Sequence, residues 1–421
     1  MKKHLFILLA CLLVVNIGFG ITLPVLAFYT ERLALEEGAN AGSAAMHVGA
    51  LTGVYALTQI FFAPLWGRFS DRVGRKPLLL LGIAGYAMAQ ALFGIGTSLW
   101  LLYAARVVGG VFAAATLPAA AAYIADTTSR ENRIRGMAWL GTAVSLGVVV
   151  GPALGGTLAR RDWHFSGQYF GHFVVDSFSV PFFAAAALGL LTLPVAIRWL
   201  PESLAARTGQ NAEETVKLGW REIVGRLRPL LVLALIGQFG LALFEAIIAL
   251  YASLKFGFGP VEVGVIFIVC GLVMAVFQIL VVGRAAGRIG EFQQIAAGFV
   301  LMGGSLMLLT AAQTTAAVFA LVGVMAFGMA LISPNLSALI SNRLDQLNTG
   351  AALGVQNVAN GLGQVAGPVA GSLLFVWSIG SPFLVAGSVL LATGLIVARY
   401  FLIEPVSTAT LDSGQPVGEK H

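Results

Sequence analysis

Charged side chains are rare in this 421-residue sequence, and two of them interrupt long apolar runs. Glu245 is the only one of 19 acidic residues well inside such a run, and Arg106 is the only one of 25 basic residues there. Ionisable groups inside a membrane are costly and usually functional. An isolated carboxyl group in a medium of low dielectric constant favours its protonated form, so it can alternately hold a proton and a cation. We predict a proton site at Glu245 and a place on a transport path for Arg106.

Both predictions have a structural alternative. Glu245 can be a protonated carboxyl group that only joins two helices, or can lie nearer the membrane surface than the apolar run suggests. Arg106 can bind backbone carbonyl groups.

Uncharged polar and aromatic residues in the same runs are further candidates. Polar side chains buried in helix bundles often only hydrogen-bond between helices, so packing is the alternative for about half of them. The polar candidates are Asn16, Gln59, Gln238, Gln278, Asn335, Asn357 and Asn360. The candidates for an aromatic wall of a binding pocket are Phe61, Phe62, Phe244 and Tyr251.

The residue types do not favour an enzyme. The five histidines lie at chain ends or in polar connections, and both cysteines lie in apolar runs, so we expect no metal, no cofactor and no disulfide framework. With 58% hydrophobic and 10% charged residues, the chain is also no reader of nucleic acid, despite its basic pI of about 9.5.

Twelve apolar runs are long enough for helices that cross a bilayer, which takes about 20 residues. They cover approximately residues 5–29, 47–67, 77–97, 99–125, 136–159, 180–199, 229–253, 261–283, 292–312, 315–341, 350–377 and 381–403. The first run follows Lys2 and Lys3 as a signal peptide would, but it continues past Cys11 to Tyr29, which favours a transmembrane helix. The sequence therefore predicts an all-α membrane protein with twelve transmembrane helices.

Lysine and arginine are distributed unevenly between the connections of these helices. With the N-terminus inside, 20 of the 25 basic residues fall in inner segments and 4 in outer loops. Inner loops of membrane proteins carry an excess of basic residues. We therefore expect both termini in the cytoplasm.

The two halves of the chain share spaced motifs. Gly147, Gly151, Pro152 and Gly155 recur 216 residues later as Gly363, Gly367, Pro368 and Gly371. Pro118 and Pro334 have the same offset, as do the pairs Gly67-Arg68 and Gly283-Arg284. These agreements predict two six-helix pseudo-repeats, which are residues 1–199 and 229–403. A polar cytoplasmic linker, residues 200–228, joins them, and residues 404–421 form a cytoplasmic tail.

The loop after the second run reads Gly67-Arg68-Phe69-Ser70-Asp71-Arg72-Val73-Gly74-Arg75-Lys76. It resembles the G-x-x-x-D-R-x-G-R-[RK] signature of the major facilitator superfamily, whereas a basic loop that only obeys the charge rule is the alternative. The resemblance implies a conformational latch, formed by Gly67, Asp71, Arg72, Gly74, Arg75, Lys76 and Asp126. Asp71 would face the positive N-terminal end of the eleventh helix, and Arg75 would pair with Asp126. The second-half copy, residues 283–291, has glycine in place of the acid.

The fifth run contains Gly147, Gly151, Pro152, Gly155 and Gly156. This pattern resembles the antiporter motif of major facilitator drug exporters, although plain small-residue packing also uses glycines four residues apart. Arg106-x3-Gly110 is similar to a further motif of that group.

Two subgroups of these exporters are similar to this sequence in different places. Residues 55–59, 124–128 and 139–141 resemble the tetracycline exporters. Those exporters carry acids or a histidine where this chain has Val15, Ala89, Met274 and Met302, which argues against a specialist for metal-chelated tetracycline. Residues 238–246, with Glu245, are similar to multidrug exporters instead.

These observations predict a proton-driven exporter of small amphipathic drugs in the cell inner membrane. Its partners would be the drug, protons and the bilayer, and it would act as a monomer. An importer of a small metabolite from the same superfamily is the alternative, and a membrane enzyme or receptor is a remote one.

Overall fold

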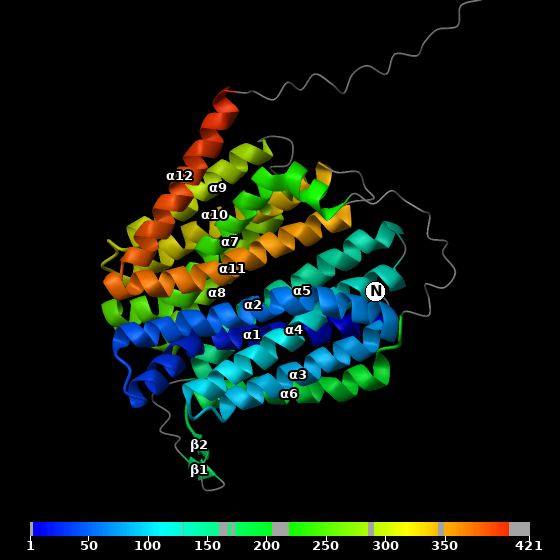
Figure 1. Cartoon of the computed structure of the whole chain (residues 1–421), viewed down its shortest axis with the longest axis horizontal. Helices are drawn as coiled ribbons and strands as arrows, with labels where there is room; N and C mark the ends of the chain where they lie inside the picture. The colour runs from blue at the N-terminus through cyan, green and yellow to red at the C-terminus, as the bar shows by residue number, and fades with distance from the viewer. Residues whose placement is uncertain are drawn as a thin grey trace, which may run out of the picture.

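The computed structural model describes residues 3–128, 130–159, 167–169, 173–203, 219–284, 290–343 and 349–403. Within these ranges the chain forms twelve long helices and one short β-hairpin (Figure 1). The first six helices are α1 (Lys3–Glu36), α2 (Ala41–Val73), α3 (Arg75–Gly94), α4 (Leu99–Thr127), α5 (Arg130–Leu158) and α6 (Ser179–Trp199). The last six are α7 (Trp220–Phe256), α8 (Pro260–Arg284), α9 (Glu291–Leu309), α10 (Thr315–Asn342), α11 (Thr349–Trp377) and α12 (Ser381–Ile403). Strands β1 (Gly167–Tyr169) and β2 (Phe173–Val175) pair in antiparallel fashion, with Gln168 opposite Val174.

The prediction of an all-α membrane protein with twelve long helices is confirmed. Eleven helices of the described ranges are long and apolar enough to cross a membrane. The twelfth, α11, has 29 residues and is long enough, but it carries Gln356, Asn357, Asn360 and Gln364. This polar stripe lowers its mean hydropathy.

Some predicted segments lie outside the described residues. Residues 204–218 take up most of the predicted linker, and residues 404–421 are the predicted tail. The second-half copy of the loop motif is also only partly described, because residues 285–289 are outside these ranges.

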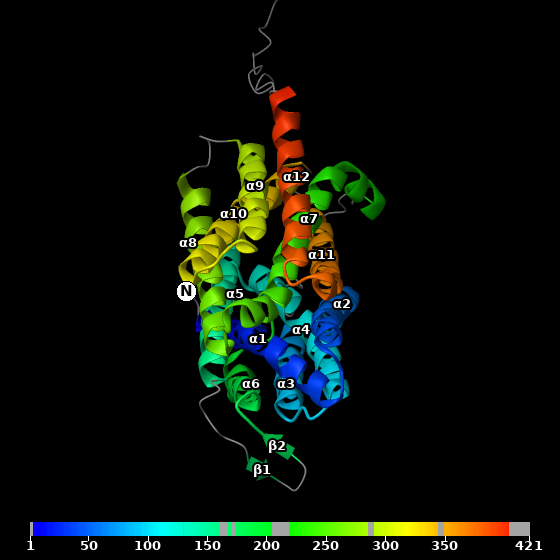
Figure 2. The same ribbon diagram turned by 90° about the vertical axis from the view of Figure 1, so that its left-hand side faces the viewer.

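Glycines allow one helix of each half to approach its neighbour closely. A Cβ atom on Gly147, Gly151 or Gly155 of α5 would collide with the backbone of α1 between Asn16 and Ile21. In the second half, a Cβ on Gly363 or Gly367 of α11 would collide with the backbone of α7. The repeated glycine spacing therefore makes the same helix contact in both halves. Figure 2 shows α1–α6 in its lower part and α7–α12 in its upper part.

Two helix pairs make the most extensive contacts between the halves, α2 with α11 and α5 with α8. Gly156 of α5 approaches α8 so closely that a Cβ on it would lie 2.6 Å from the carbonyl oxygen of Pro260. Gly49 of α2 makes a similar approach to Pro368 and Ser372 of α11. All these contacts lie near the ends of the helices that are far from the loop motif of residues 67–76.

The halves are apart at the other end of the molecule, which we call the motif end because it carries residues 67–76. A Cβ atom on Gly67 of α2, Gly141 of α5 or Gly354 of α11 would meet no heavy atom within 4 Å. The side chain of Leu65 on α2 is 55% exposed. The motif end of these interface helices is therefore less closely packed than the opposite end.

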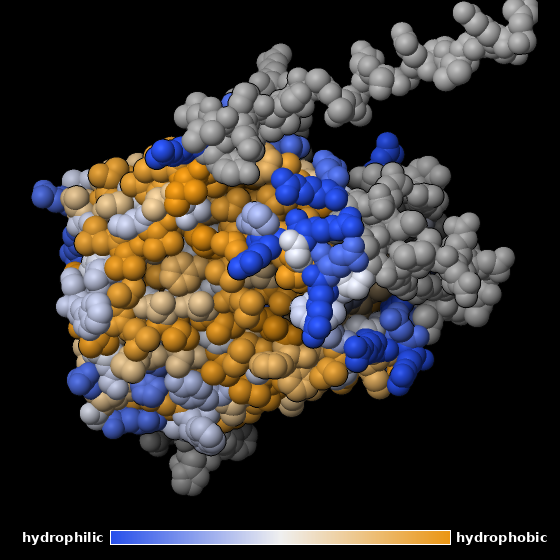
Figure 3. Space-filling model, turned by 45° about the horizontal axis from the view of Figure 1, so that its top comes forward, coloured by the Kyte–Doolittle hydropathy of each residue, from blue (hydrophilic) through white to orange (hydrophobic). Residues whose placement is uncertain are grey.

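The surface of the bundle has the distribution expected of a membrane protein. Figure 3 shows a broad apolar surface, with hydrophilic side chains gathered at the left edge and towards the right end. The apolar band lies between the two ends of the helices, where lipid tails would surround it.

Candidate substrate and proton-coupling site

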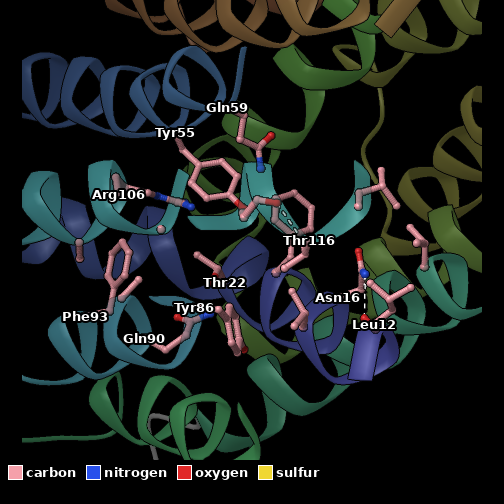
Figure 4. Close-up of a pocket in the computed structure, with 18 of the residues that line it drawn as sticks. Leu12, Asn16, Thr22, Tyr55, Gln59, Tyr86, Gln90, Phe93, Arg106 and Thr116 are labelled. Atoms are coloured by element: carbon pink, nitrogen blue, oxygen red, sulfur yellow. Dashed lines mark hydrogen bonds between the residues drawn. The ribbon is translucent and has the colours of Figure 1, made fainter. Parts of the chain in front are cut away.

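A cavity of about 200 Å³, which we call the central cavity, lies among the helices of the first half. Side chains of α1, α2, α3 and α4 form most of its wall, with Val144 of α5 and Gln364 of α11 completing it. Its polar lining residues are Asn16, Thr22, Tyr55, Gln59, Tyr86, Gln90, Arg106, Thr116 and Gln364. Figure 4 shows several of these side chains converging on one space from α1–α4.

Arg106 is the charged residue of this wall. The residue is only 6% exposed, and its guanidinium carbon lies 5.1 Å from the centre of the Tyr55 ring and 5.3 Å from that of Phe93. In such cation–π interactions, the negative face of each aromatic ring attracts the guanidinium cation. Its Nε atom is buried without a hydrogen-bond partner, and no carboxylate in the described residues is within 4 Å of the guanidinium group. The arginine is buried, therefore, without the carboxylate that usually accompanies a buried cation.

Glu245 of α7 lies on the opposite side of the interface between the halves. It lines a second cavity, of about 30 Å³, together with Arg106 and residues of α1, α2 and α11. Five residues line both cavities: Phe19, Thr22, Tyr55, Arg106 and Gln364. The embedded acid and the embedded base therefore line adjoining cavities, although they come from different halves and form no ion pair in the described residues.

The structure brings together only some of the predicted polar site residues. Asn16 and Gln59 line the central cavity, and the Asn16 amide donates a 2.8 Å hydrogen bond to the Leu12 carbonyl within α1. Gln238, Gln278, Asn335, Asn357 and Asn360 line neither cavity. Asn335 has the packing role weighed as the alternative, because its amide donates to Gln294 at 3.1 Å and to the Leu331 carbonyl at 2.7 Å. Gln278 and Asn357 are exposed, and both lie on interface helices.

None of the four aromatic residues predicted for a pocket wall lines either described cavity. Phe61 is 65% exposed, whereas Phe244 and Tyr251 are at most 1% exposed in the core of the second half. Phe62 lines neither cavity. Residue type alone does not distinguish these positions, because core packing and lipid contact use the same aromatic residues. The aromatic residues of the cavity wall are Phe19, Tyr55, Tyr86 and Phe93.

Two glutamines complete the polar wall of the central cavity, Gln90 of α3 and Gln364 of α11. Gln90 donates a 3.1 Å hydrogen bond to the Gly18 carbonyl of α1, which fixes its orientation against the cavity. Gln364 belongs to the polar stripe of α11 and lines both cavities. It lies at helical spacing from Asn357 and Asn360.

The motif end carries a cluster of charges around Arg75, whose side chain is 3% exposed. Its Nε donates to Asp126 at 3.1 Å, and its two terminal nitrogens donate to Asp71 at 2.6 Å and to the Ser70 hydroxyl at 2.8 Å. The pair of Arg75 with Asp126 was expected from the sequence. Asp71 does not reach α11 within the described residues, because its side chain is 61% exposed and points to Arg75 instead.

The remaining motif residues surround this cluster. Gly74 has a φ of +116°, which a residue with a side chain rarely adopts, and it separates α2 from α3. Lys76 donates to the Ile197 carbonyl at 2.8 Å, so it joins α3 to the end of α6. Arg72 is exposed, and Gly67 has open space around it.

Glu202 is a cluster residue that the sequence did not reveal. Its carboxylate accepts hydrogen bonds from the backbone N–H groups of Arg75 at 2.9 Å and Lys76 at 3.1 Å, which cap the first turn of α3. A carboxylate at this position also interacts favourably with the helix dipole. The contact joins positions 127 residues apart in the sequence, so no local spacing pointed to it.

The predicted antiporter motif forms two interfaces. Gly147, Gly151 and Gly155 face α1, as described above, whereas Gly156 and the Pro152 carbonyl face Gly264 of α8 in the other half. The motif therefore lies between the helix that supplies Asn16 to the cavity and the interface along which the halves meet.

Comparisons with known proteins agree with this architecture. A family model described as Major Facilitator Superfamily matches residues 5–304 and, in a second match, residues 256–419. Multidrug resistance protein 2 of Bacillus subtilis (strain 168) is 30% identical over 403 residues, which are 93% of each chain. The class B tetracycline resistance protein of Escherichia coli is 31% identical over 382 residues, covering 87% of this chain and 89% of that protein. A solved bacterial homologue of the human lysosomal transporter Spinster, in an inward-facing and occupied conformation, has the same fold: its TM-score is 0.75 at 14% identity, over 96% of this chain and 98% of that one. The chain belongs to the major facilitator superfamily and is a multi-pass membrane protein.

Proposed function

We propose that this protein exports small amphipathic drugs from the cell in exchange for protons. The observation that carries the proposal is the position of Glu245, an embedded acid that faces the same region as Arg106 from the other half of the molecule. The similarity to proteins of multidrug and tetracycline resistance supports drugs as the substrates.

Alternating access would move the drug. We infer that residues 1–199 and 229–403 rock against each other and that residues 200–228 link them on the cytoplasmic side. Close glycine contacts support this motion, because α5 and α8 meet across the halves with small side chains at the contact. The basic residues favour a motif end in the cytoplasm, so the described state would be the one that receives drug from inside.

Glu245 would couple this motion to protons. The ionised carboxylate attracts a cationic drug into a region of low dielectric constant, where a charge without a partner is costly. After the drug leaves on the outside, a proton takes its place and neutralises the carboxylate for the return. Binding of drug and proton would thus exclude each other at one group.

The charge cluster at the motif end would act as the latch of the opposite state. Asp71 is exposed here and paired with Arg75, at the end where the halves are apart. When the motif end closes, the carboxylate can reach the positive N-terminal end of α11. Arg75 and Asp126 would hold it in place for that contact.

The cavity supports a broad drug specificity more than a metal-chelate specificity. Val15 and Ala89 form part of the wall of the central cavity, and neither can bind a metal ion. The described residues contain no group of three histidine, cysteine, aspartate or glutamate side chains that could hold one. We propose a cell inner-membrane location, both termini in the cytoplasm and action as a monomer.

Expression in a host that lacks its own efflux pumps tests the proposal. Cells that produce the protein should survive higher concentrations of several chemically different amphipathic drugs than cells with an empty vector. Inside-out vesicles should accumulate the same drugs when acidified inside, and a protonophore should abolish the accumulation. Uptake of a metabolite by intact cells, without drug resistance, would favour the importer instead.

A further inference from the structure

We propose that Arg106 is an anion-binding subsite and that the central cavity selects aromatic molecules that bear a carboxylate. This inference rests on the proposed function and specifies its substrate class. Drugs with a carboxylate at one end and an amine at the other would then span from Arg106 to Glu245.

The first support is the missing partner of Arg106. A buried guanidinium group normally has a carboxylate or several carbonyl groups around it, because an unpaired charge in a protein interior is strongly unfavourable. Only 6% of Arg106 is exposed. Its Nε atom has no hydrogen-bond partner, and no carboxylate of the described residues pairs with its guanidinium group. Two aromatic rings hold the cation, which leaves its hydrogen-bonding capacity for a ligand.

The second support is the direction of the side chain. Figure 4 shows Arg106 extending from α4 towards Tyr55, with Phe93 on its other side, at the edge of the space that the lining residues surround. Arginine presents donors in a planar fork that matches a carboxylate in two simultaneous hydrogen bonds. An anion bound in the central cavity would therefore meet this fork.

The third support is the composition and size of the wall. Phe19, Tyr55, Tyr86 and Phe93 provide faces for an aromatic ring, and Gln59 and Gln90 lie among them. The volume of about 200 Å³ equals six or seven times the roughly 30 Å³ of a water molecule in the liquid. This is room for one ring with a carboxylate, while the rest of a larger molecule would extend towards Glu245 and the open end.

Glu245 completes the recognition of charge. It lines the adjoining 30 Å³ cavity with Arg106, so the two groups offer opposite charges to one ligand. The acid would bind the amine, and the arginine would bind the carboxylate. A neutral or purely cationic molecule would use only part of this site.

A pair of dyes tests the subsite directly. One dye is a rhodamine with a free aryl carboxylate, and the other is its methyl ester, which has the same ring system and lacks only the anion. Fluorescence anisotropy measures the binding of each dye to the purified, full-length protein in detergent. The proteins compared are the wild type, Arg106→Gln, Arg106→Lys and the control Arg198→Gln, which removes an exposed arginine at the end of α6.

The wild type should bind the carboxylate dye more tightly than the ester. Arg106→Gln should weaken binding of the carboxylate dye about tenfold or more, as expected for a lost charge-assisted hydrogen bond. Its affinity for the ester should stay within about twofold of the wild-type affinity. Arg106→Lys keeps the charge without the planar fork, so its affinity for the carboxylate dye should lie between those of the wild type and Arg106→Gln. Arg198→Gln should bind both dyes as the wild type does.

Two results would overturn the subsite. One is equal weakening of both dyes by Arg106→Gln and Arg106→Lys, which would show that the arginine only maintains the fold of the cavity. The other is a wild type that does not bind the carboxylate dye more tightly than the ester. Neither result contradicts drug export, which the resistance and vesicle experiments decide independently.

Discussion

Removing the negative charge of Asp126 should destabilise the protein more than removing that of Asp71. Both carboxylates accept hydrogen bonds from Arg75, at 3.1 Å and 2.6 Å. Asp126 is 7% exposed and Asp71 is 61% exposed. An exposed ion pair contributes roughly 0–1 kcal/mol, whereas loss of one partner of a buried pair costs about 3–5 kcal/mol.

The expected cost of Asp126→Asn lies at the lower end of that range. Arg75 keeps Asp71 and the Ser70 hydroxyl as acceptors, and the new amide still offers an oxygen to its Nε. We therefore expect about 3 kcal/mol for Asp126→Asn and less than about 1 kcal/mol for Asp71→Asn. The entropy of unfolding grows with chain length, so a chain of 421 residues shifts by roughly 1 °C per kcal/mol, and the first variant should lose about 3 °C of thermal stability.

The double variant Arg75→Gln/Asp126→Asn sharpens the comparison. In Asp126→Asn, the buried Arg75 guanidinium group has lost its buried carboxylate partner. Replacing Arg75 as well removes this poorly paired charge and should restore part of the stability. Thermal unfolding of the four purified proteins in one detergent measures these differences. Equal midpoints for Asp71→Asn and Asp126→Asn, or a double variant no more stable than Asp126→Asn, would refute this reasoning.

Three further predictions concern the latch, the glycine interface and the topology. Asp71→Asn should fold and insert but transport several-fold more slowly in vesicles, because it loses the charge that faces α11 when the motif end closes; transport at the wild-type rate would contradict the latch. Gly151→Val should abolish accumulation of folded protein, judged by gel filtration, because its side chain would collide with the α1 backbone, whereas Gly141→Ala has open space and should accumulate normally. Arg221→Cys should react with a membrane-impermeant maleimide in inside-out vesicles and not in intact cells, since the exposed residue belongs to the predicted cytoplasmic linker, and labelling of intact cells would reverse the topology.

Most of the fold could be predicted because the membrane imposes strong rules on sequence. Long apolar runs must be helices, so twelve of them implied twelve spans. The 216-residue offset predicted two six-helix pseudo-repeats, and the corresponding helices α5 and α11 both pack by their glycines, α5 against α1 and α11 against α7. Such contacts require small residues at fixed spacing, and this requirement is visible in the sequence.

The site was only partly predictable, for a physical reason. Glu245 and Arg106 were identified because a charge in an apolar run needs a function. Uncharged residues carry no such cost, so Asn335, which bonds to Gln294, was indistinguishable from Asn16, which lines the cavity. The long-range cap of α3 by Glu202 depends on how α6 ends against α3, which only the folded chain reveals.

Proton release from the purified protein tests the central claim, that Glu245 exchanges protons for drug. Wild-type protein and Glu245→Gln are prepared in weakly buffered solution with a pH-sensitive dye, and a cationic drug is added to each. The wild type should release protons as the drug binds, and Glu245→Gln should release none, because its amide resembles the protonated carboxyl group and cannot ionise. Proton release by Glu245→Gln equal to that of the wild type would place the proton site elsewhere and contradict the account.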